Sequence, residues 1–197
     1  MTIMTTSRKN FAVFVSGSGT NCENLIRYFH DSPVANPALV VSNKADAYAL
    51  VRAERLQVPT AVVTRAELAC PDIVRPLLSR YGVEFIVLAG FLPLVPDYLI
   101  DDFPRRIINL HPSLLPKFSG KGMWGRHVHE AVKAAGESVT GMTVHYVTPV
   151  CDAGDIIAQF STPLTPDDTV DDIAGKEHQL EMTYFPQVVE QVILSTI

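Results

Sequence analysis

The fold of this chain is decided by the stretch RIINLHPSLLP, residues 106–116. Its apolar start is typical of a buried strand, and Pro112 holds the residue before it in an extended conformation. Side chains alternate between the two faces of a strand, so Asn109 and His111 point in the same direction. An amide and an imidazole at the carboxyl end of a strand favour a ligand site, because open α/β sheets bind ligands there. Taken alone, the two residues fit a hydrogen-bonded pair without chemistry equally well.

The segments before this stretch alternate between short apolar runs and helical patterns. We expect strands at 11–15, 39–41, 59–63, 84–89 and 106–110, and helices at 22–30, 46–56 and 64–81. This alternation predicts parallel strands joined by right-handed crossovers. Thr64 and Glu67 form a capping box that opens the third helix, and Pro71 and Pro76 predict that its first half is irregular.

The segments after it predict a different edge of the sheet. A helix at 127–135 is followed by strands at 139–148 and 155–162, whose short connection favours an antiparallel pair. A closing helix at 169–192 contains Pro186, where we expect a kink. The fold class is therefore α/β, a single Rossmann-like domain with a mostly parallel twisted sheet, flanking helices and an antiparallel C-terminal edge. We expect residues 1–9 to be a disordered leader and residues 10–197 to form the domain.

Composition limits the class of protein. With 197 residues, 47% of them hydrophobic and 19% charged, the chain fits one globular domain with a sizeable core. The net charge is -5 and no basic run is present, so nucleic acid is not an expected partner. Cys22, Cys70 and Cys151 lack the spacing of a metal or redox motif, which indicates reduced thiols in a cytoplasmic protein. No apolar run is long enough to cross a membrane.

The loop SGSGTN, residues 16–21, follows the first expected strand. Gly17 and Gly19 allow the backbone to approach a ligand, and the helix that follows offers free N–H groups and a positive dipole end. The third glycine of a dinucleotide fingerprint would fall on Cys22, so we expect a single phosphate here in preference to a dinucleotide. A tight turn without a ligand is the alternative.

Two further groups of polar residues have weaker patterns. Asp152 lies in a turn with Gly154 after the expected strand at 139–148, and a carboxylate near an imidazole favours the charged imidazolium. An aspartate that caps its own turn is an equally good interpretation of that segment. His127 and His129 are two residues apart on an expected helix and face away from each other, so we expect no metal site there.

Five segments together resemble the folate-dependent formyltransferase family: SGSGTN (16–21), SNKADA (42–47), LAGFL (88–92), NLHPSLLP (109–116) and DAG (152–154). They run through almost the whole chain in the family's order, and the last two are specific for its fold. The first two are similar to the branch that formylates glycinamide ribonucleotide. Methionyl-tRNA formyltransferases and formyltetrahydrofolate deformylases resemble this chain too, but each carries an additional domain that we do not expect in a chain of this length.

The resemblance implies transfer of a formyl group from the co-substrate 10-formyltetrahydrofolate to the amine of glycinamide ribonucleotide, in de novo purine biosynthesis. It implies a catalytic trio of Asn109, His111 and Asp152, without a metal. It also implies substrate and folate contacts, for the ribose phosphate at Gly17, Gly19, Thr20 and Asn21, for the glycinamide at His178, Gln179, Leu180 and Glu181, and for the folate at Arg65, Leu92, Pro93, Leu94, Val95, Asn109, Thr148, Pro149, Val150, Cys151 and Asp152.

The chemistry agrees with these residue types. An amine that attacks the formyl carbon produces a tetrahedral oxyanion, which requires hydrogen-bond donors and a proton for the leaving nitrogen. Asn109 supplies a neutral donor, and His111, kept charged by Asp152, supplies charge and an acid. No protein nucleophile is needed, because the substrate brings its own amine.

Two departures from the family and three alternatives remain. Pro93 stands where many members have arginine, and the loop at 119–125 differs from the shorter version of some relatives. A sugar-nucleotide N-formyltransferase or a formyltetrahydrofolate deformylase would use the same trio, and a binding module without turnover is the third alternative. We expect small-molecule partners only, no membrane partner, and a monomer or homodimer.

Overall fold

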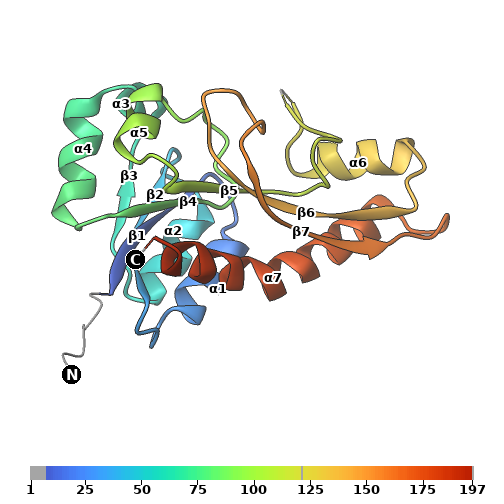
Figure 1. Ribbon diagram of the computed structural model, residues 1–197, viewed down its shortest axis with the longest axis horizontal. Coiled ribbons are helices and arrows are strands. Elements are labelled where there is room, and N and C mark those ends of the chain that lie inside the picture. Colours follow the sequence, from blue (N-terminus) through green and yellow to red (C-terminus); the bar gives the residue numbers. More distant parts are fainter. Residues whose placement is uncertain (1–7, 121, 197) are drawn as a thin grey trace.

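The computed structural model describes residues 8–120 and 122–196 (Figure 1). Of the expected leader at 1–9, residues 1–7 lie outside the described residues, and Lys9 already belongs to the first strand. The elements in chain order are β1 (Lys9–Val15), α1 (Thr20–Tyr28), β2 (Ala35–Ser42), α2 (Tyr48–Arg55), β3 (Thr60–Val62), α3 (Arg65–Leu68), α4 (Pro71–Arg80), β4 (Phe85–Leu88), α5 (Asp97–Asp102), β5 (Ile107–His111), α6 (Arg126–Ala134), β6 (Val139–Tyr146), β7 (Ile156–Pro163) and α7 (Val170–Leu194).

The described strands form one 7-stranded sheet in the order β3-β2-β1-β4-β5-β6-β7. The strands from β3 to β5 pair in parallel, and β6 and β7 add to the sheet antiparallel. This arrangement confirms the predicted fold class, including the antiparallel edge. The carboxyl ends of β1, β4 and β5 are neighbours in the sheet, so the loops that follow them lie side by side.

Helices cover both faces of the sheet. In Figure 1 α1, α2 and α7 cover one face of the sheet, and α3, α4 and α5 cover the opposite face, to the left and upper left of the sheet. The side chains of β1 alternate accordingly, with Phe11 and Val13 in the core under the first group of helices and Ala12 and Phe14 in the core under the second. All four are fully buried, as the strand pattern requires.

A smaller third core joins α6 to the start of α7. Val128 and Val132 of α6 pack with Ile173 of α7, and Phe118 and Met123 from the preceding loop pack against them. This small core therefore supports the loop between β5 and α6, which follows residues 106–116.

The structure differs from the sequence-based expectation in one helix and adds another. The predicted helix at 64–81 is two helices, because the capping box of Thr64 and Glu67 opens only the short α3. Pro71 then occupies the first turn of α4, where a missing N–H costs nothing, and Pro76 remains inside α4. The six-residue α5, which starts after Pro96, has no counterpart in the sequence analysis.

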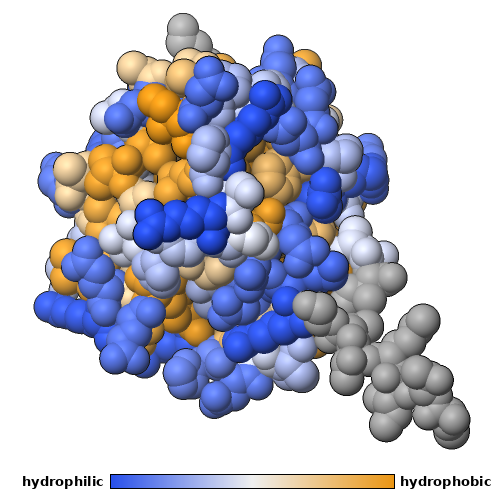
Figure 2. All heavy atoms as spheres, turned by 90° about the vertical axis from the view of Figure 1, so that its left-hand side faces the viewer, coloured by the Kyte–Doolittle hydropathy of each residue, from blue (hydrophilic) through white to orange (hydrophobic). Residues whose placement is uncertain are grey.

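The surface over α3 and α4 mixes hydrophobic and hydrophilic side chains in the view of Figure 2. Ile73 and Val62 are the most exposed large apolar residues of the two elements α4 and β3, at 44% each. Within the part of the chain that the structure describes, no helix combines the length and the apolar character needed to cross a membrane.

Candidate active site

Asn109 and His111 lie at the carboxyl end of β5, as the alternation predicted. Asn109 is directly opposite His145 of β6 in the antiparallel register, and its Nδ2 lies 3.0 Å from Nε2 of His145. Nδ1 of His145 lies 2.9 Å from the carbonyl oxygen of Tyr146, so this nitrogen carries the proton and donates. Nε2 of His145 is then an acceptor for the amide of Asn109. Burial lowers the pKa of His145, which agrees with a neutral imidazole.

His111 is held between a loop carbonyl and a carboxylate. Its Nε2 donates to the carbonyl oxygen of Phe118 at 2.9 Å, and its Nδ1 lies 3.7 Å from Oδ1 of Asp152. The side chains of His111 and Asp152 are only 5% and 8% exposed. The two ring nitrogens therefore face a carbonyl oxygen on one side and a buried carboxylate on the other.

Asp152 is brought to both imidazoles by the loop between β6 and β7. Its Oδ1 also lies 3.7 Å from Nε2 of His145, and its Oδ2 accepts from the backbone N–H of Gly120 at 3.0 Å. Asp152 therefore does not simply cap its own turn. The turn also differs from the expectation, since Asp152 itself has the left-handed φ of 54°. Gly154 is needed for a close approach, because a Cβ there would lie 1.7 Å from the carbonyl oxygen of Tyr146.

The glycine loop after β1 ends at the N-terminus of α1. Gly19 is the residue before the helix and has a φ of 77°. A Cβ on Gly19 would lie 2.4 Å from Cβ of Ala49 in α2, so the position needs glycine for both conformation and space. Thr20 and Asn21 form the first turn of α1, whose N–H groups have no partner within the helix. Gly17 has no atom within 4 Å of an added Cβ.

The predicted glycinamide contacts lie on α7, and the structure brings one of them to the glycine loop. Nδ2 of Asn21 donates to Oε2 of Glu181 at 2.8 Å. His178 Nδ1 lies 3.4 Å from the same oxygen, and this hydrogen bond raises the pKa of His178. Gln179 is exposed, and Leu180 packs against the main core. Of the four predicted contacts, Glu181 therefore meets the loop directly, and His178 is linked to it through Glu181.

The predicted folate contacts form three separate surface segments. The segment after β4 is tied to the glycine loop, because the N–H of Leu92 donates to Oγ of Ser16 at 2.9 Å. Leu94 is 71% exposed and Val150 is 66% exposed, so both offer apolar surface. Pro93 is buried, and Arg65 is exposed at the start of α3. The other predicted contacts of these segments are partly or fully exposed: Val95, Thr148, Pro149 and Cys151.

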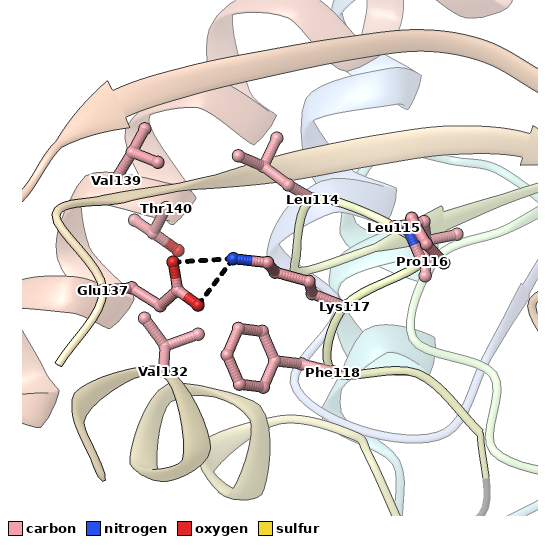
Figure 3. Close-up of a pocket in the computed structure, with 9 residues that line it drawn as sticks. All are labelled: Leu114, Leu115, Pro116, Lys117, Phe118, Val132, Glu137, Val139 and Thr140. Carbon is pink, nitrogen blue, oxygen red and sulfur yellow. Dashed lines mark hydrogen bonds and ion pairs between the residues drawn. The ribbon is translucent and has the colours of Figure 1, made fainter. Parts of the chain in front are cut away.

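A cavity of about 220 Å³ lies behind the loop that carries Phe118 (Figure 3). Apolar side chains line it, and Lys117 pairs with Glu137 across it at 2.8 Å. None of the predicted catalytic residues lines the cavity. Phe118 is common to both places, since its ring lines the cavity and its carbonyl accepts from His111.

The helix-borne histidines have structural partners. His127 Nδ1 lies 3.7 Å from Glu130, and His129 Nδ1 lies 2.8 Å from the buried Glu177, although the N–H direction does not meet hydrogen-bond geometry. Among residues 8–120 and 122–196, no three His, Cys, Asp or Glu side chains gather in an arrangement suited to a metal ion.

Residues 9–189 match a family model described as formyl transferase. The chain belongs to the formyl transferase family. A phosphoribosylglycinamide formyltransferase of Bacillus subtilis (strain 168) is 36% identical over 190 residues, which are 94% of this chain and 95% of the relative. A chloroplastic phosphoribosylglycinamide formyltransferase of Arabidopsis thaliana is 37% identical over 196 residues, 94% of this chain and 67% of the relative.

The fold similarity is of the same extent. The crystal structure of phosphoribosylglycinamide formyltransferase from Anaplasma phagocytophilum has a TM-score of 0.86 and 33% sequence identity to this chain, and covers 95% of this chain and 88% of the other. The family match therefore covers the sheet and the loops that follow β1, β4 and β5.

The structure adds to this candidate site one residue that the sequence analysis did not single out. His145 is the only described side chain that accepts from the Asn109 amide. Its signal was the alternation along the expected strand at 139–148, which places it in the strand next to β5. Without the register of β5 against β6, that pattern does not distinguish a site residue from an ordinary core histidine.

Proposed function

We propose that this chain transfers a formyl group from 10-formyltetrahydrofolate to the amine of glycinamide ribonucleotide. The observation that carries the proposal is the assembly of Asn109, His111 and Asp152 at the carboxyl end of β5, with a buried carboxylate 3.7 Å from the imidazole. The names of the relatives and of the similar crystal structure support the same acceptor over a sugar nucleotide or water.

The acceptor would lie between the glycine loop and α7. The N-terminus of α1 and the backbone around Gly19 receive the ribose phosphate, because helix N-termini bind anions. Glu181 receives the glycinamide end, and its bond to Asn21 joins the two subsites. The exposed side chains of Leu92, Leu94 and Val150 contact the pterin from the other side.

The chemical step proceeds through a tetrahedral intermediate. The neutral amine attacks the formyl carbon, a C–N bond forms, and the formyl oxygen becomes an oxyanion. The amide of Asn109 uses one N–H for His145 and offers the other to this oxygen, while the imidazolium of His111 supplies positive charge. The attacking nitrogen then gives up one proton and N10 of the folate gains one, and the oxyanion re-forms the C=O bond as the bond from the carbon to N10 breaks.

His111 must exchange one partner during this reaction. Its Nε2 donates to the Phe118 carbonyl, so a direct bond to the oxyanion requires the substrate oxygen to replace that carbonyl. Asp152 remains opposite Nδ1 and balances the charge of the imidazolium. The residues themselves supply this chemistry, and we assign no metal to the reaction and no partner beyond the two small-molecule substrates.

The proposal is tested by measuring loss of 10-formyltetrahydrofolate with three acceptors. Glycinamide ribonucleotide, an amino-sugar nucleotide and water alone are compared at the same enzyme concentration, with formylated product identified by mass spectrometry. We expect turnover with glycinamide ribonucleotide that far exceeds the other two. Equal loss of formyl groups with water alone would identify a deformylase and contradict the proposal.

A further inference from the structure

Three contacts hold the glycine loop against α2. The N–H of Ala49 donates to the carbonyl of Gly17 at 3.1 Å, and Nε of Arg52 donates to the carbonyl of Ser18 at 2.9 Å. Gly19 rests directly on Ala49. Ala49 and Arg52 are three residues apart and share one face of α2, so the helix contacts two successive peptide groups of the loop.

These two bonds determine where the loop N–H groups point. The C=O and N–H of a trans peptide group point in opposite directions. Since the carbonyls of Gly17 and Ser18 are turned toward α2, the N–H groups of Ser18 and Gly19 are turned away from it. Successive N–H groups on one side of a turn form a concave anion site, which extends here into the N-terminus of α1.

Arg52 also balances a carboxylate at this site. Glu23 lies in the first turn of α1, where its charge stabilises the helix dipole but would repel a phosphate. Arg52 donates to one carboxylate oxygen of Glu23, and Arg27 donates to the other at 2.7 Å. The bonds to Arg27 and Arg52 lower the pKa of Glu23, which stays ionised and paired.

We propose that Arg52 is a positioning residue of the phosphate subsite. It fixes the peptide group between Ser18 and Gly19 with its N–H turned toward the phosphate, and it offsets the charge of Glu23 in the same place. This inference rests on the proposed function for the identity of the phosphate ligand, since glycinamide ribonucleotide would bring that phosphate.

Arg52→Met and Arg52→Lys test this role, with Arg55→Met as the matched control. Arg55 lies on the same helix and also stacks on Tyr48, but contacts neither Ser18 nor Glu23. We expect Arg52→Met to raise the KM for glycinamide ribonucleotide about ten- to a hundredfold, the range for one lost hydrogen bond to a charged group. The KM for the folate and kcat should change less than about twofold, as should all three constants in Arg55→Met.

Two further measurements separate position from charge. Arg52→Lys keeps the charge but cannot bond Ser18 and Glu23 in the same fork geometry, so we expect an intermediate KM. Adding Glu23→Gln to Arg52→Met should reverse only the part of the rise in KM for glycinamide ribonucleotide that comes from the unpaired charge of Glu23. If Arg52→Met does not fold, as judged by its melting curve, the comparison of Arg52→Lys with Arg55→Met decides.

Inorganic phosphate gives a readout that does not depend on turnover. Its Kd, measured by calorimetry, should rise in Arg52→Met and stay unchanged in Arg55→Met. If wild-type protein binds phosphate but does not formylate glycinamide ribonucleotide, the proposed function fails while the role of Arg52 stands. Equal effects of Arg52→Met and Arg55→Met, equal changes in both KM values, or a fall in kcat alone would each overturn the role of Arg52.

Discussion

The bond between Asn109 and His145 allows a sharp test of the oxyanion site. His145 is neutral and accepts through Nε2, so the Asn109 amide is fixed with its second N–H free for the substrate oxygen. His145→Asn retains a donor near the position of Nδ1 but removes the acceptor. His145→Gln places an amide oxygen near the position of Nε2 and retains the acceptor. The two variants therefore differ mainly in whether Asn109 remains oriented.

The expected magnitude follows from what Asn109 contributes. Losing one oxyanion donor costs about 2.7–4 kcal/mol, or a hundred- to a thousandfold in kcat, which is the expected effect of Asn109→Ala. His145→Asn leaves Asn109 in place but unrestrained, so its effect on kcat should be smaller, about ten- to a hundredfold. His145→Gln should stay within about fivefold of wild type, because one neutral hydrogen bond is worth about 1 kcal/mol.

Steady-state kinetics with glycinamide ribonucleotide and 10-formyltetrahydrofolate measure kcat and KM for each variant, and melting temperatures show whether each variant is folded. The double variant Asn109→Ala with His145→Asn should be no slower than Asn109→Ala alone, because the two side chains act as one unit. Additive losses would refute the reasoning. So would equal rates of His145→Asn and His145→Gln, since His145 would then act through Asp152, which lies 3.7 Å from its Nε2.

Three other predictions concern the loop, a buried carboxylate and a helix. Gly19→Ala brings a Cβ within 2.4 Å of Ala49 Cβ at a φ of 77°, so the KM for glycinamide ribonucleotide should rise far more than that for the folate in the same assay; equal rises would argue against a phosphate role. Burial raises the pKa of Glu177, so the folded protein binds the carboxyl proton more tightly than the unfolded chain does. The free energy of unfolding that this proton contributes is therefore lost as the pH rises from about 4.3, the unfolded pKa, through the folded pKa. Glu177→Gln should flatten this fall in urea denaturation from pH 4 to 8, and an unchanged slope would assign it to another group. Gly175→Ala, in α7 with no atom within 4 Å of the new Cβ, should stabilise the protein by about 0.5–1 kcal/mol, visible as a higher urea midpoint, whereas destabilisation would reveal a contact at that face.

Much of the fold follows from the sequence through short-range geometry. The alternation of strand and helix patterns implied the parallel sheet, and the pleat of β5 placed Asn109 and His111 on one side. The capping box at Thr64 was equally readable, because its partner Glu67 is three residues away. The helix that it opens ends early, because Pro71 begins a new helix at a position where a proline has no N–H to lose.

Local sequence patterns were sufficient for the fold class and the positions of most elements, and the family resemblance predicted the trio and the substrate contacts. Three contacts of the site emerge only in the folded chain: His145 lies opposite Asn109, Asp152 lies near two imidazoles, and Asn21 bonds to Glu181. The physical reason is range. Periodicity and capping depend on residues a few positions apart, whereas these contacts join residues that meet only after strand register and helix packing are set. Asn21 and Glu181 are 160 positions apart, so no local sequence pattern predicts that their side chains form a hydrogen bond.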